Sequence, residues 1–92
     1  MINEQFTRIK SQVVELTTAN KPYLIPSYPL LERKTLIIHN TTDEIIYVGG
    51  SDLNNENGLP IKSGDYFITS LSNNVYALCG TDGQQIRIVE LG

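Results

Sequence analysis

The sequence has few of the residues that build reactive sites. Its 92 residues include one cysteine, Cys79, and one histidine, His39. A single cysteine excludes a disulfide framework within the chain. One cysteine and one histidine are also too few for a zinc site made from His and Cys ligands of one chain. We therefore predict no catalytic, cofactor-binding or metal-binding residues, no cofactor and no enzyme activity from one chain. A composite site between subunits stays open.

Basic residues are also few. Seven Lys and Arg stand against ten Asp and Glu, which gives a net charge of −3. Binding to nucleic acid or to a membrane surface requires a basic footprint, so we expect neither partner. No segment approaches the ~20 apolar residues of a transmembrane helix, and residues 1–10 lack the apolar stretch of a secretory signal.

Alanine is scarce, whereas β-branched residues are abundant. The chain has two Ala against sixteen Val and Ile, and β-branched side chains favour strands over helices. Seven Gly, four Pro and eight Asn supply turn positions every 8–12 residues. This pattern predicts an all-β fold, a small antiparallel β-sandwich or barrel of six to seven strands, formed by one domain over residues 12–92.

Residues 1–11 are interpreted as an N-terminal arm or a short helix. Ile2, Phe6, Ile9 and Val13 recur at helical spacing, but the segment is polar and terminal. A first strand in this segment is the alternative.

The clearest predicted strands are Lys34–His39 and Glu44–Gly49. Their near-continuous apolar runs are typical of strands that are covered on both faces. Four polar residues separate them, which predicts a hairpin. Asp82 and Gly83 likewise predict a tight hairpin before the last strand, residues 85–91.

Residues 50–64 form the longest predicted irregular segment. Asp52, Asn54 and Glu56 alternate like the oxygen ligands of a calcium loop, but the glycine and the closing glutamate of that motif are missing from their positions. A polar surface loop explains these residues without a metal. Loops of this length often carry function.

The order of segments from Arg33 onward follows a recognisable layout. A basic residue precedes an apolar strand and Asn; Tyr-x-Gly-Gly-x-x-Leu, Asn-Gly-x-Pro, Gly, Tyr-Ala and Arg-x-x-Glu follow. This layout resembles that of small virion structural proteins of tailed bacteriophages and prophages, over roughly the last two-thirds of the chain. Tyr47–Leu53 and Asn57–Pro60 are its most specific parts.

The resemblance implies a virion structural protein that is present in multiple copies and has no catalytic residues. Its partners would be other phage virion proteins: the major capsid protein, portal or connector proteins, or tail proteins. We favour a capsid decoration protein or a head–tail connector over a tail component. It would form a homo-oligomer and reside in the virion, assembled in the bacterial host cytoplasm. The alternative is a carbohydrate-binding β domain for host recognition, which needs exposed tyrosines gathered on one face.

Four apolar residues in polar segments are the candidate contacts for such partners. Phe6 and Ile9 belong to the predicted arm, and Leu53 and Leu59 to the long loop. Apolar residues in polar segments are exposed unless something covers them. For Leu53 and Leu59 a second interpretation stands beside this one, in which they pin the loop to its own sheet.

Overall fold

The chain forms strands throughout the part that the structure describes. The structure, a computed structural model, describes residues 8–70 and 73–92. These residues contain eight strands and no helix. The strands are β1 (Ile9–Leu16), β2 (Tyr23–Ile25), β3 (Thr35–His39), β4 (Ile46–Gly49), β5 (Leu59–Ile61), β6 (Tyr66–Thr69), β7 (Val75–Cys79) and β8 (Gln84–Leu91). The all-β prediction is confirmed, with eight strands in place of six or seven.

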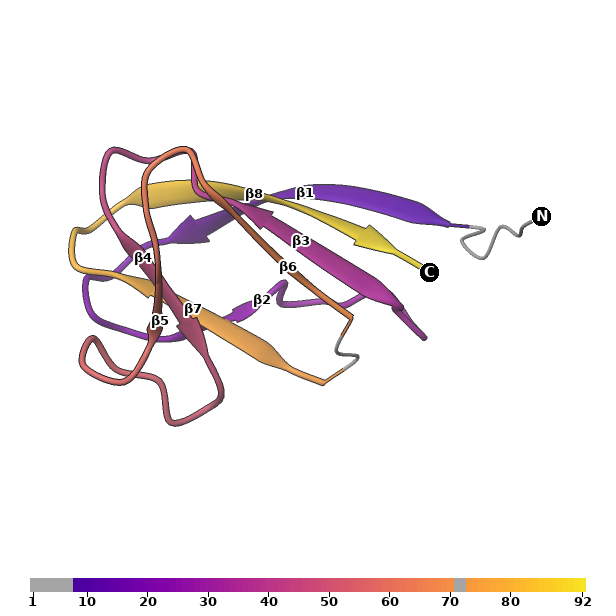
Figure 1. Cartoon of the computed structure of the whole chain (residues 1–92), viewed down its shortest axis with the longest axis horizontal. Coiled ribbons are helices and arrows are strands. Elements are labelled where there is room, and N and C mark those ends of the chain that lie inside the picture. The colour runs from indigo at the N-terminus through magenta and orange to yellow at the C-terminus, as the bar shows by residue number, and fades with distance from the viewer. Residues whose placement is uncertain (1–7, 71–72) are drawn as a thin grey trace.

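The eight strands form two antiparallel sheets of four (Figure 1). One sheet has the order β1-β8-β3-β6, and the other has the order β2-β7-β4-β5. Strand pairing is therefore nested: the first strand pairs with the eighth, the second with the seventh, the third with the sixth and the fourth with the fifth. Nested pairing of eight strands across two sheets is the arrangement of a jelly roll.

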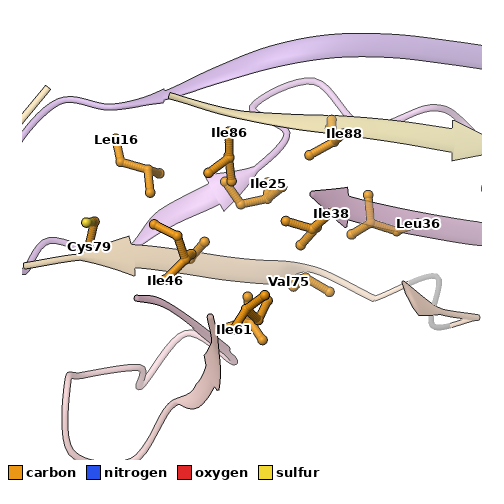
Figure 2. Packing of buried hydrophobic residues seen from close by; sticks show 12 residues of the cluster. Leu16, Ile25, Leu36, Ile38, Ile46, Ile61, Val75, Cys79, Ile86 and Ile88 are labelled. Carbon is orange, nitrogen blue, oxygen red and sulfur yellow. The ribbon is translucent and has the colours of Figure 1, made fainter. Parts of the chain in front are cut away.

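The core lies between the two sheets, as in a β-sandwich. Leu36, Ile38, Ile86 and Ile88 on one sheet are buried against side chains of the other, and Figure 2 shows both sets pointing into the same layer. The opposing set comprises Ile25, Ile46, Val48, Ile61, Val75, Ala77 and Cys79. Because side chains alternate across a strand, the residues between these positions point to the outer faces.

The two predicted hairpins are wrong. β3 pairs with β6 and β8, whereas β4 pairs with β5 and β7, so residues 40–45 cross from one sheet to the other. The turn at Asp82 and Gly83 also joins strands of different sheets. The predicted turn at Gly83 is present, since this residue has φ +70°. A crossing between two facing sheets needs the same short polar connection as a hairpin, so the turn residues do not distinguish the two.

The first strand begins within residues 1–11, the segment interpreted as an arm or a short helix with a first strand as the alternative. β1 begins at Ile9 and stays in register with β8 from Leu91 to Gln84. Arg8 and Gly92 extend this ladder by exchanging two backbone hydrogen bonds, of 2.8 and 2.9 Å. The predicted arm, residues 1–11, therefore overlaps β1 at its last three positions. Residues 1–7 lie outside the described residues, so an arm there stays a prediction.

The additional strand, β5, lies in the segment predicted as an irregular loop. It has three residues with Pro60 at its centre, and proline weakens any prediction of a strand. β5 is the edge strand of its sheet, where a missing backbone N–H is tolerated.

Candidate interaction surface

The outer face of the sheet β1-β8-β3-β6 carries apolar side chains on all four strands. In the register of the sheet, Val89 lies between Ser11 and Ile37, and Ile37 lies beside Ile68. One row further along each strand, Arg87 lies between Val13 and His39. We call this surface the outer sheet face; its apolar members are Ile9, Val13, Ile37, Tyr66, Ile68, Val89 and Leu91.

Four apolar members of the outer sheet face have more than half of their surface exposed to solvent. Ile9 is 70% exposed, Val13 58%, Tyr66 61% and Ile68 64%. Ile37, between them, is half-buried. Ile9 and Val13 lie on β1 and Tyr66 and Ile68 on β6, the two edge strands of this sheet. The partly buried Val89 and Ile37, on the two strands between them, join these residues into one apolar area. Contiguous apolar patches on soluble proteins mark interaction sites.

The sequence of β3 explains why this face differs from an ordinary solvent-facing sheet. A sheet that is covered on one side alternates apolar and polar residues, yet Leu36, Ile37 and Ile38 form an unbroken apolar run. The second sheet covers Leu36 and Ile38, which are fully buried, but Ile37 points the other way. The run is thus suited to a second covering layer, which residues 8–70 and 73–92 do not supply.

Polar side chains also lie on the outer sheet face, namely Ser11, Glu15, Thr35, His39, Gln85 and Arg87. The rings of His39 and Tyr66 are stacked, with centroids 4.2 Å apart and planes 9° from parallel. Arg87 neighbours His39 in the register. A shallow hollow of about 360 Å³ between β1 and β8 is lined by Ser11, Gln12, Val13, Arg87, Ile88 and Val89. Arg87 lines this hollow, and Tyr66 lies on the same face two strands from β8. Arginine and tyrosine are among the residue types that dominate binding energy in protein interfaces.

The other sheet keeps part of its outer face under its own chain. Tyr47 points outward between the buried Ile46 and Val48, and the loop between β4 and β5 returns over it. A Cβ on Gly58 would lie 2.7 Å from Tyr47 Cβ and 2.6 Å from Leu53 Cδ1, so only glycine permits this approach.

The four predicted contact residues lie in different places. Ile9 belongs to the outer sheet face. Leu59, 55% exposed, lies on the edge strand β5 of the other sheet, so the fold does not bring it beside Ile9. Leu53 is only 5% exposed and packs inside its own loop, which matches the pinning interpretation. Phe6 lies outside the described residues.

Sequence reasoning missed most of the outer sheet face. Val13 fits the helical spacing of the N-terminal segment, and no local contrast in the sequence sets Tyr66 or Ile68 apart. The signal was present in the apolar run of residues 36–38, which predicted coverage on both faces. What the sequence did not reveal is that the second cover is absent from the described chain.

The side chains that could in principle react or bind a metal are buried or hydrogen-bonded within the fold. Cys79 is fully buried in the core. In the calcium-like loop, Asn54 Oδ1 accepts hydrogen bonds from the backbone N–H groups of Glu56 and Asn57, which folds the loop on itself. No group of three or more His, Cys, Asp or Glu side chains in the described ranges could hold a metal ion.

Two further findings complete the description. The part of the chain seen in the structure has no helix long and apolar enough to cross a membrane. Comparisons with protein-family models, curated proteins and solved structures found no match to this chain.

Proposed function

We propose that this chain is a structural protein of a tailed-bacteriophage virion and that it acts by binding neighbouring virion proteins through the outer sheet face. The observation that carries the proposal is the contiguous apolar area on β1, β8, β3 and β6, of which Ile9, Val13 and Ile68 are each more than half exposed. A covered outer face is what the apolar run in β3 is built for.

The layout that resembles small virion proteins also supports the proposal, because residues of that layout have structural roles in this fold. Arg33 and Glu90, at the two ends of that layout, form a buried ion pair of 3.1 Å. Gly58, from its most specific part, allows the loop to approach Tyr47. These residues shape the domain, whereas the exposed outer sheet face provides the binding surface. The place in the virion, on the capsid shell or in the head–tail connector, is part of the proposal.

Repeated binding gives such a protein its affinity. Many copies on a symmetric lattice or ring raise the overall affinity, since each bound copy holds its neighbours at high effective concentration. Copy number in the particle therefore belongs to the mechanism.

Tyrosine placement favours protein binding over carbohydrate binding. The two most exposed tyrosines are Tyr28 at 81% and Tyr66 at 61%. Tyr66 lies on β6, at one edge of its sheet, while the Tyr28 carbonyl accepts a hydrogen bond from Lys10 of β1, at the opposite edge. A sugar-stacking platform needs these rings side by side, so the carbohydrate-binding alternative lacks support from this arrangement.

The test is to examine purified particles of the phage or prophage that encodes the chain. Quantitative mass spectrometry should find the protein in wild-type particles at a fixed copy number, with five, six or twelve copies indicating a vertex or connector and hundreds indicating shell decoration. Ile68→Lys should fold normally and be lost from particles. The matched control is Leu31→Lys, which changes an apolar residue outside the outer sheet face that is 77% exposed, against 64% for Ile68. Wild-type particles that lack the protein would refute the proposal.

A further inference from the structure

The free edge of β1 differs from the other three sheet edges. β2 and β5 have three residues each and carry prolines: Pro22 and Pro26 flank β2, and Pro60 lies within β5. β6, the fourth edge strand, has four residues. β1 has eight residues with neither proline nor glycine. Short strands and prolines protect sheet edges from pairing with other chains, so β1 is the one long edge in the described structure without these protections.

The backbone of β1 offers a regular row of hydrogen-bonding groups at this edge. Arg8 and Gly92 exchange two hydrogen bonds, so they are a hydrogen-bonded pair of the antiparallel ladder. Such pairs alternate with pairs whose N–H and C=O groups point away from each other. The backbone groups of Ile9, Ser11 and Val13 therefore point away from β8, toward the free edge.

Two exposed apolar side chains of β1 are placed symmetrically about Ser11. Ile9 and Val13 stand two residues to either side of it, and both are exposed on the outer sheet face. A hollow of about 270 Å³ lies along the same edge, lined by Gln12, Val13, Val14, Glu15, Tyr23, Leu24, Ser27 and Tyr28. Residues 23–28 supply the other wall of this hollow.

We propose that two copies of this chain pair through β1, antiparallel, about a twofold axis at Ser11. Ile9 of each copy then lies opposite Val13 of the other, and Lys10 lies opposite Gln12, so no like charges meet. The outward-pointing backbone groups of Ile9, Ser11 and Val13 form hydrogen-bonded pairs, while apolar β-branched pairs flank the axis. The pairing joins two four-stranded sheets into one sheet of eight strands, with one continuous outer face.

The pairing deepens the proposed function and rests on it, because the doubled outer face is the surface offered to the virion. A second copy fits this edge better than an unrelated strand, since the spacing of Ile9 and Val13 about Ser11 is matched by the same spacing in an identical strand running the opposite way. Both copies also keep their own β1–β8 ladder intact.

The first test measures self-association of the purified chain. Analytical ultracentrifugation over a concentration series should show a dimer of the wild-type protein. Ser11→Pro removes an N–H that points away from β8, so it leaves the β1–β8 ladder complete and should raise the dimer dissociation constant at least tenfold. Ile68→Lys, three strands away on the same face, should leave the dimer unchanged. A wild-type monomer at high concentration, or a Ser11→Pro dimer of unchanged affinity, would overturn the pairing.

The second test keeps the proposal decidable if Ser11→Pro does not fold. Ser11→Cys places two thiols across the axis, on Cα atoms about 5.5 Å apart, so a short bismaleimide should link two chains. Ile68→Cys is the control, because seven strand spacings would separate its two copies by about 34 Å. Equal linking of both variants, or none, would overturn the pairing.

The two proposals fail separately. Loss of the Ile68→Lys chain from particles, combined with no linking of Ser11→Cys, retains the proposed function and removes the pairing. A linked Ser11→Cys dimer, combined with no wild-type protein in particles, retains the pairing and removes the proposed function.

Discussion

The guanidinium of Arg33 lies 3.1 Å from the carboxylate of Glu90, and both side chains are buried. Glu90 Oε2 also accepts a hydrogen bond from the Leu30 N–H, and Arg33 Nη2 donates one to the Asn73 carbonyl at 2.7 Å. The pair therefore joins β8 to two connecting segments that are distant in the sequence. An ion pair in a buried position is costly to break because either partner alone is an uncompensated charge.

Glu90→Leu should destabilise the fold strongly, since it leaves the Arg33 guanidinium buried without its carboxylate. We expect a loss of about 3–5 kcal/mol in the free energy of unfolding, measured by urea denaturation. The double variant Arg33→Met, Glu90→Leu should recover much of this loss, because no charge then remains buried. A double variant less stable than Glu90→Leu would contradict this account.

Gly58→Ala should destabilise the loop between β4 and β5. The added methyl group would lie 2.6 Å from Leu53 Cδ1, closer than atoms pack, and overpacking typically costs about 1–3 kcal/mol. Thermal unfolding measures the effect. Gly80→Ala is the control, since the nearest atom to its Cβ outside the adjoining residues, Asn20 Oδ1, is 3.9 Å away. Equal stability of the two variants would show that the loop yields freely.

Leu53→Ala and Leu59→Ala should separate the two interpretations of the long loop. Leu53 is buried, so its truncation should cost about 2–5 kcal/mol of unfolding free energy. Leu59 is 55% exposed, and its truncation should cost much less. Chemical denaturation of both variants gives the comparison, and a larger cost at Leu59 would reverse the assignment.

Asn40→Ala should disrupt the crossing between β3 and β4. The buried Asn40 amide donates to the carbonyls of Glu44 and Ile61, each at 2.8 Å, and its Oδ1 accepts from the Thr42 N–H and hydroxyl. Each buried group left without a partner costs roughly 1–3 kcal/mol. Denaturation should show a loss above about 2 kcal/mol, whereas the exposed Asn55→Ala should be nearly neutral.

The sequence predicted strand content and most strand positions, because those depend on local preferences. The β-branched runs at residues 35–39 and 46–48 became strands, and Gly83 took the left-handed turn conformation. Strand partners were not predictable in the same way. Residues 40–45 have the length and polarity of a hairpin loop, yet the buried Asn40 leads the chain across to the opposite sheet.

The candidate surface was predictable only in part. Ile9 stood out as an apolar residue in a polar segment. Val13 and Ile68 did not, since their exposure depends on which face of each strand the second sheet covers. Leu53 illustrates the converse: it is apolar in a polar loop, but Gly58 lets that loop close around it. Local contrast identifies unusual residues, and the pairing of distant strands decides whether they are exposed.

Nested strand pairing also orders events during synthesis. β1 leaves the ribosome first among the described strands, but β8, the strand it pairs with there, is the last to be made. The β4–β5, β3–β6, β4–β7 and β2–β7 pairs need no residue of β8 and can form earlier. Closure of the loop from β1 to β8 spans the longest separation among the described strand pairs and is slow. Nascent chains therefore carry β1 with both edges open, and crowded polysomes expose it to neighbouring copies before its own sheet is closed.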